Sequence, residues 1–284
     1  MNARAACRVA APSDAERIAA LAERSLVLEI DTYPKPGLVS HVDTGSHTDM
    51  DAATFACSAA VLRPYFAELA DAGARDADMA VLRKIGLRAE HAMLAATGGV
   101  NTHRGAIFGL GLLCAAAGRR ALPDGMTLGA FVSCRWGVEI LGGPRLPDSH
   151  GERASRRYGV GGARREAADG FPTVYAVGLP ALRGAQRDLP DDPEAARVAA
   201  CFALIAALDD TNLLHRGGQD GLDFARATAR AFVARGGVRV PDWRLRAAAA
   251  HRAFVARRLS PGGAADLLAM SVFVDALEAE GHAR

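Results

Sequence analysis

The sequence predicts an all-α fold: a single-domain multi-helix bundle spanning residues 1–284, with long functional loops between some of the helices. The first observation behind this prediction is that apolar residues recur at intervals of three and four along most of the chain. The second is that no convincing run of strands is present, and residues 174–177 form one short candidate. The third is that 50% of the 284 residues are hydrophobic, which is enough to bury a sizeable core.

Six segments have the helical period. The first is expected to begin near Ser13, and either Asp49 or Asp51 is a natural N-cap for the second. The third ends at a pair of glycines, and a proline occupies a first-turn position in the fifth and sixth. Their apolar positions cover residues 18–28, 55–69, 82–96, 107–114, 198–208 and 267–277.

The fourth of these helices is rich in small residues. Gly105, Gly109 and Gly111 lower its intrinsic helix propensity, but they permit close contact with neighbouring helices. We therefore expect it to be the central helix. Residues 141–170 differ, because they are rich in Gly, Pro and Arg. That composition predicts a long functional loop with room for one short helix.

Charge and cysteine content narrow the class of protein. The 34 Lys and Arg residues nearly balance 32 Asp and Glu, which gives no bulk case for nucleic acid or a membrane surface as a partner. The five cysteines are scattered without a CxxC pair, as is typical of reduced thiols in the cytoplasm. The beginning of the chain lacks a signal-peptide pattern, and the longest apolar run is too short to span a bilayer. We therefore expect a cytoplasmic protein.

The most unusual segment is the polar loop TYPKPGLVSHVDTGSHTDMD, residues 32–51, between the first two helices. It holds two histidines, three aspartates and two serines, and almost none of it is useful for a hydrophobic core. Two prolines stiffen its backbone. A loop so dense in hydrogen-bonding side chains is a better candidate for a site than for a connector, and its aspartates suit Mg²⁺.

Two further segments suggest an anionic ligand. In residues 98–111, Asn101, His103 and Arg104 lie at the expected start of the central helix, where backbone N–H groups attract anions. Ordinary helix capping explains the same residues about equally well. Residues 148–171 contain five arginines, whose guanidinium groups suit polyphosphate. A solvated surface is the alternative explanation for that run.

Two other segments contain acids that helix rules do not explain. In residues 208–221, a pair of glycines can end the preceding helix, but Asp209 and Asp210 are disfavoured at the C-terminal end of a helix. In residues 260–271, Asp266 is the odd residue because it interrupts an apolar run. These acids therefore mark the two segments as candidate parts of a site.

Several well-known templates do not match. The chain has no GxxxxGK[ST] loop, no GxGxxG after a strand, no HExxH and no GxSxG, and the spacing of its aspartates does not fit a calcium loop. The remaining chemistry consists of carboxylates, arginines and a hard metal ion acting on a phosphorylated ligand.

Taken together, five segments resemble the family of triphosphoribosyl-dephospho-CoA synthases. They are TYPKPGLVSHVDTGSHTDMD, GGVNTHRGAIFGLG, YGVGGARREAADGFP, DDTNLLHRGG and SPGGAADLLA. The resemblance implies an all-α fold and a glycosyl transfer in which ATP and 3′-dephospho-CoA give 2′-(5-triphosphoribosyl)-3′-dephospho-CoA and adenine. This product is the precursor of the prosthetic group on the acyl carrier subunit of malonate decarboxylase or citrate lyase. The form of the first segment resembles the malonate decarboxylase branch more closely.

The resemblance and the residue chemistry together suggest roles. We expect catalysis to involve Asp49, Asp51, Asp210 and His47. We expect the substrate and its phosphates to be bound by Lys35, Ser40, Asn101, His103, Arg104, Arg164 and Arg216. We expect Mg²⁺ to be held by Asp43, Asp49, Asp209 and Asp210. Glu29 and Glu166 are lesser candidates.

Two other functions remain open from sequence alone. The same residues would suit a Mg²⁺-dependent nucleotide hydrolase, and a helical binding module for the carrier subunit is a non-catalytic alternative. The expected partners are ATP and dephospho-CoA, with the carrier-loading transferase and the acyl carrier subunit as candidate protein partners. The apolar residues 247–255 would suit a homodimer interface, although core packing explains them equally well.

Overall fold

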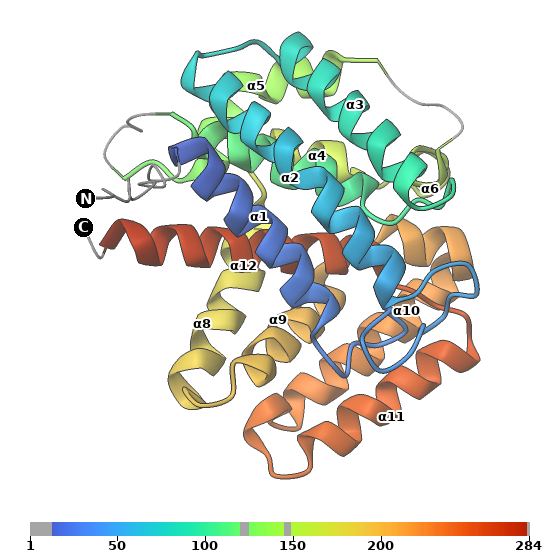
Figure 1. Ribbon diagram of the computed structural model, residues 1–284. Helices are drawn as coiled ribbons and strands as arrows, with labels where there is room; N and C mark the ends of the chain where they lie inside the picture. Colours follow the sequence, from blue (N-terminus) through green and yellow to red (C-terminus); the bar gives the residue numbers. More distant parts are fainter. Residues whose placement is uncertain (1–12, 120–124, 145–148, 283–284) are drawn as a thin grey trace, which may run out of the picture.

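The computed structural model describes residues 13–119, 125–144 and 149–282, and within these ranges it contains helices and no strands. The all-α prediction is thus confirmed (Figure 1). Cys7 and the start of the chain, on which the signal-peptide expectation rests, lie outside the described residues. The α-helices are α1 Asp14–Ile30, α2 Ala52–Ala74, α3 Met79–Ala96, α4 Arg104–Ala117, α5 Leu128–Gly142, α6 His150–Tyr158, α7 Gly162–Ala168, α8 Leu179–Asp188, α9 Pro193–Ala207, α10 Thr211–Ala234, α11 Trp243–Ala256 and α12 Gly262–His282.

The expected helix caps are largely confirmed. Ser13 caps α1 by accepting a hydrogen bond from the backbone N–H of Glu16 at 3.2 Å. Of the two candidate caps for α2, the structure selects Asp51, whose Oδ1 accepts from the backbone N–H of Thr54 at 2.8 Å. These short polar side chains satisfy N–H groups that have no partner inside the helix.

Helix α4 is central, as its small residues predict. It packs against α1, α2, α3, α5, α7 and α12, and Figure 1 shows it behind α2 with α12 crossing nearby. A Cβ atom on Gly109 would lie 1.8 Å from Cε of Met270, and one on Gly105 would lie 2.0 Å from Oδ2 of Asp266. The glycines therefore allow α12 to approach the first two turns of α4.

Two predictions of irregular structure are wrong. The segment 141–170 contains two short helices, α6 and α7, where room for one was expected. Helix α6 was missed because it is strongly polar and buries Ala154 alone, so it has too few apolar residues to mark a helix in the sequence. The candidate strand at 174–177 is instead a π-helix, Val174–Gly178, which leads directly into α8. A short 3₁₀ helix, Gly237–Arg239, precedes α11.

The pair of glycines at 217–218 does not end the preceding helix, because α9 already ends at Ala207. Helix α10 begins after Asp210 and continues through a kink at Gly218, whose φ is 62°. Asp210 therefore lies at the N-terminal end of α10, where a negative charge is favourable. This placement removes the conflict that the sequence presented.

Three other expectations can be compared with the structure. Ala247 and Phe254 of α11 are fully buried, so core packing accounts for the apolar stretch there. All four described cysteines are free. Within the described ranges, no single helix is both long and apolar enough to cross a membrane, whereas α9 and α10, which are bent by 60°, pass that test as a pair by length and composition only.

Candidate active site

A cavity of about 1230 Å³ lies among the segments that the sequence singled out. Its walls include the loop before α2, one face of α3, and the N-terminal ends of α4, α6, α10 and α12. Helix N-terminal ends present backbone N–H groups and a partial positive charge. Their convergence makes the cavity suited to a highly charged anion.

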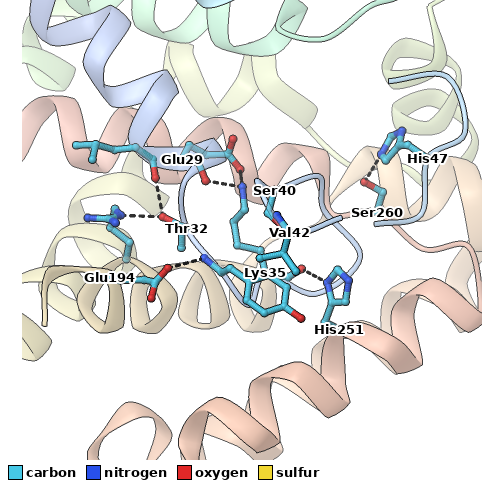
Figure 2. A network of polar contacts seen from close by, with 12 residues as sticks. Glu29, Thr32, Lys35, Ser40, Val42, His47, Glu194, His251 and Ser260 are labelled. Carbon is cyan, nitrogen blue, oxygen red and sulfur yellow. Dashed lines mark hydrogen bonds and ion pairs between the residues drawn. The ribbon is translucent and has the colours of Figure 1, made fainter. Parts of the chain in front are cut away.

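Lys35, which was expected to bind phosphate, lies inside the protein and not on the cavity wall. Its side chain is fully buried, and Nζ donates to the backbone oxygen and to Oε1 of Glu29 (Figure 2). The backbone oxygen of Lys35 also interacts with Nδ1 of His251 at 2.6 Å. Because its charge is already used to neutralise Glu29, Lys35 anchors the loop to α1 and does not reach the cavity.

Three more residues of this loop have structural contacts outside the cavity lining. Oγ of Ser40 accepts from the backbone N–H of Val42 at 3.2 Å. The carboxylate of Asp43 contacts Nε2 of His251 at 3.1 Å, and Asp51 is the exposed N-cap of α2. The structure thus does not bring Ser40, Asp43 or Asp51 into the candidate site.

His47 and Asp49 do line the cavity, beside Arg216 of α10. Nε2 of His47 lies 2.9 Å from Oγ of Ser260 (Figure 2), and its Nδ1 lies 3.2 Å from Nη2 of Arg216. Burial, together with the charge of Arg216, lowers the pKa of His47, so its imidazole is neutral near pH 7. Asp49 is exposed, with an oxygen 3.7 Å from Nδ1 of His47.

The start of α4 supplies three of the expected residues. Oδ1 of Asn101 accepts from the backbone N–H of Arg104 at 3.1 Å, and the Arg104 guanidinium is paired with Glu90 of α3. His103 is buried, with Nδ1 2.7 Å from Oγ of Ser58. Burial, with a smaller contribution from the charge of Lys35, lowers the pKa of His103 to about 3. His103 is therefore a neutral hydrogen-bonding group.

Arg164 and Glu166, both from α7, also line the cavity. Arg164 donates to backbone oxygens at the end of α5, including that of Leu141 at 2.8 Å and that of Gly143 at 3.0 Å. It thereby satisfies carbonyl groups that lack a partner inside α5. Glu166 accepts from the backbone N–H of Thr173 at 2.8 Å, and burial raises its pKa.

Asp209 and Asp210 lie side by side in sequence but have different environments. Asp209 is exposed and pairs with Nη2 of Arg226 at 2.8 Å. Asp210 is buried, and it accepts from the backbone N–H groups of Asn212 at 2.8 Å and Ala264 at 3.0 Å. It therefore joins the N-terminal ends of α10 and α12, and burial raises its pKa despite these bonds.

The expected Mg²⁺ ligands do not form a cluster. In the part of the chain that the structure describes, no three His, Cys, Asp or Glu side chains are arranged to hold a metal ion. Asp43 faces His251, and Asp210 is occupied by backbone donors. Asp49 and Asp209 are the two members of the set whose exposed carboxylates line the cavity. A site made of protein ligands alone is thus not supported.

Sequence reasoning underrated two acids in the cavity wall. Glu29 from α1 was a lesser candidate, and Asp266 from α12 was noted but given no role. Burial raises the pKa of Asp266 well above its usual range, and the charges of Asp210 and Glu29 add to the effect. The sequence did contain a signal for both, since each is an acid on an otherwise apolar stretch of helix.

Similarity to known proteins identifies the family of this chain. The family model described as ATP:dephospho-CoA triphosphoribosyl transferase matches residues 15–141 and 142–284. The chain belongs to this family. It is therefore an enzyme of the transferase class, and the substrates of the family are ATP and dephospho-CoA. The family predicted from the five sequence segments is confirmed.

Individual relatives match nearly end to end. A protein of Stutzerimonas stutzeri, named a probable 2-(5''-triphosphoribosyl)-3'-dephosphocoenzyme-A synthase, is 43% identical over 275 residues, covering 94% of this chain and 93% of the relative. Proteins with the same name from Azotobacter vinelandii and Pseudomonas aeruginosa PAO1 are 42% and 44% identical, with 94% and 93% of this chain covered and 93% and 92% of the relatives. No solved structure matches the chain.

Proposed function

We propose that this enzyme transfers the triphosphoribosyl group of ATP to the 2′-hydroxyl of 3′-dephospho-CoA, releases adenine, and thereby serves malonate decarboxylase. The observation that carries the reaction is the cavity, which combines helix N-terminal ends with cations and acids. Its volume of about 1230 Å³ exceeds the roughly 300–1,000 Å³ typical of pockets for one small ligand. Such a volume suits two nucleotides bound together.

The triphosphate is the part of ATP that the cavity is best suited to hold. Arg104 and Arg216 line it with positive charge, and Asn101 and His103 add hydrogen-bonding groups at the start of α4. Arg164 lies on the same wall and would add charge next to its carbonyl partners. In this proposal Lys35, Ser40, Asp43 and Asp51 support the fold of the site from outside the cavity.

Mg²⁺ would arrive bound to ATP. Because Mg²⁺ sites in nucleotide enzymes use phosphate oxygens with one or two carboxylates, Asp209 is the ligand that the cavity offers when Asp49 is kept free to accept a proton. The ion would neutralise part of the triphosphate charge. This role requires no preformed cluster of protein ligands, in agreement with the scattered arrangement of the acids.

The attacking hydroxyl needs a proton acceptor. Asp49 is the proposed base, because its carboxylate is exposed in the cavity wall and adjoins the neutral imidazole of His47. Asp210, an earlier candidate, is less suitable because its oxygens accept from the backbone N–H groups of residues on α10 and α12. We assign Asp210 to the organisation of the site.

The reaction can be tested by incubating the enzyme with ATP, 3′-dephospho-CoA and Mg²⁺, followed by chromatography and mass spectrometry. Adenine should appear in a 1:1 ratio with a species whose mass equals dephospho-CoA plus triphosphoribose. Release of ADP or phosphate without this adduct would instead indicate the hydrolase. No consumption of ATP, even with carrier protein present, would favour the binding module.

The physiological role needs a second test. The form of the loop SHVDTGSHTDMD favours malonate decarboxylase over citrate lyase. We expect the product, together with the carrier-loading transferase, to modify the acyl carrier subunit of malonate decarboxylase. The acyl carrier subunits of malonate decarboxylase and of citrate lyase, both from the organism that encodes this chain, should be tested as acceptors side by side. Modification of the citrate lyase carrier alone would reverse the assignment.

A further inference from the structure

Asp266 lines the cavity, but the proposed function gives it no role. It lies in the first turns of α12, and its partly accessible carboxyl lines the cavity. It receives a backbone N–H from Ala106 in the first turn of α4. A Cβ atom on Gly105 would lie 2.0 Å from Oδ2 of Asp266. The glycine thus leaves the space in which this carboxyl reaches the start of α4.

The three deep acids of the cavity differ in how their charges are compensated. Glu29 is paired with the ammonium group of Lys35. Asp210 accepts from four backbone N–H groups at the starts of α10 and α12, whereas the carboxyl of Asp266 accepts from one, that of Ala106. Asp266 therefore has the weakest compensation, and it faces the charges of the other two.

The cations near the start of α4 do not compensate the charge of Asp266. Arg104 is paired with Glu90, and the imidazole of His103 is neutral because burial lowers its pKa to about 3. Burial and the neighbouring carboxylates raise the pKa of Asp266 well above its usual range. Of the three acids, Asp266 has the fewest groups that stabilise its charged form, and its carboxyl lies in the cavity wall, where it can act as a proton donor.

We infer that Asp266 is the catalytic acid of the glycosyl transfer, and that it donates its proton to a ring nitrogen of the departing adenine. This inference rests on the proposed function. As the bond from C1 of the ribose to N9 breaks, its electron pair moves onto the purine, which takes the proton of Asp266. The 2′-hydroxyl oxygen forms the new bond to C1, and its proton passes to Asp49. Proton exchange with water then restores both carboxyl groups.

The electrostatics favour donation in this direction. The transition state of glycosyl transfer is oxocarbenium-like. When Asp266 loses its proton, a carboxylate appears beside that developing positive charge. A purine anion is a poor leaving group, whereas a protonated base leaves as neutral adenine. Catalysis by a positioned acid typically contributes about 10²–10⁴-fold to the rate.

The test compares Asp266→Asn with the wild type on two substrates. One is ATP, and the other is ATP methylated at N7, whose positively charged base leaves as a neutral molecule without receiving a proton. We expect the variant to lose about 10²–10⁴-fold in kcat with ATP and less than about tenfold with the methylated substrate, because that substrate bypasses the acid. Asp275→Asn is the matched control, since Asp275 lies on the same helix, pairs with Arg183 and is not part of the cavity lining.

An equal loss on both substrates would overturn the inference, because it would indicate a structural role. If Asp266→Asn does not fold, the wild type alone decides. Its kcat with ATP should fall as the pH rises through the raised pKa of Asp266, and this fall should be absent with the methylated substrate; the same fall with both would overturn the inference. Failure of the proposed function is distinguishable, since the wild type would then release no adenine from ATP.

Discussion

Asp210 offers the sharpest test of how the site is held together. Its two carboxylate oxygens accept from Asn212 at 2.8 Å and Leu213 at 3.3 Å on α10, and from Ala264 at 3.0 Å on α12. Asp210→Ala removes an N-cap, which costs about 1 kcal/mol. It also leaves the buried N–H of Ala264 without its partner, which costs about 1–3 kcal/mol. Relief from burying a charge offsets part of this loss.

The expected net effect of Asp210→Ala is a loss of about 2 kcal/mol of unfolding free energy. For a chain of this length, that corresponds to a fall in Tm of about 4 °C. Urea unfolding followed by circular dichroism at 222 nm measures the first quantity, and thermal unfolding measures the second. Asp209→Ala is the matched control, because Asp209 is exposed and its pair with Arg226 is worth less than about 1 kcal/mol. Equal stability of the two variants would refute the role given to Asp210.

Three further predictions concern other charged residues. Lys35→Met should destabilise the fold by about 3–5 kcal/mol, since it leaves Glu29 buried without its partner. In chemical denaturation, the double variant Lys35→Met with Glu29→Gln should recover part of this loss of unfolding free energy, and no recovery would contradict the pairing. Asp49→Asn should reduce kcat at least about a hundredfold with an unchanged circular dichroism spectrum, and near-normal adenine release would exclude Asp49 as base. Because the pKa of Asp266 is raised in the folded state, its contribution to stability is present below its unfolded pKa and lost as the pH rises through its folded value. Asp266→Asn should therefore raise Tm relative to the wild type at pH 8 more than at pH 4, and a difference that does not grow with pH would contradict the burial of this acid.

The sequence predicted the helices well where an apolar stripe faces the core. The Ser13 cap and the small residues of α4 are local signals, and both are confirmed. Helix α6 was missed because its surface is almost entirely polar. The π-helix Val174–Gly178 resembles a strand in sequence because Val and Tyr favour strands, but its neighbours impose helical geometry.

The five segments singled out in the sequence meet around one cavity, but several of the residues named in them lie outside its lining. The loop 32–51 contains acids and a lysine whose types fit catalysis, capping or internal pairing equally well. Lys35 and Asp51 lie outside the cavity lining, and their side chains contact Glu29 and the backbone of Thr54. Side-chain direction decides between such roles, and it depends on tertiary packing that no local pattern specifies.

Asp210 also explains how a site for a polyanion can contain buried acids. The N-terminal ends of α10 and α12 would attract phosphate, but their first N–H groups are occupied by this carboxylate. At the start of α4 the backbone N–H groups of Arg104 and Ala106 are likewise taken, by Asn101 and Asp266. In the proposed function the triphosphate is therefore held by the side chains of Arg104 and Arg216 and not by the starts of α10 and α12. Replacing Asp210 would then change where the triphosphate binds as well as how firmly the two helices are joined.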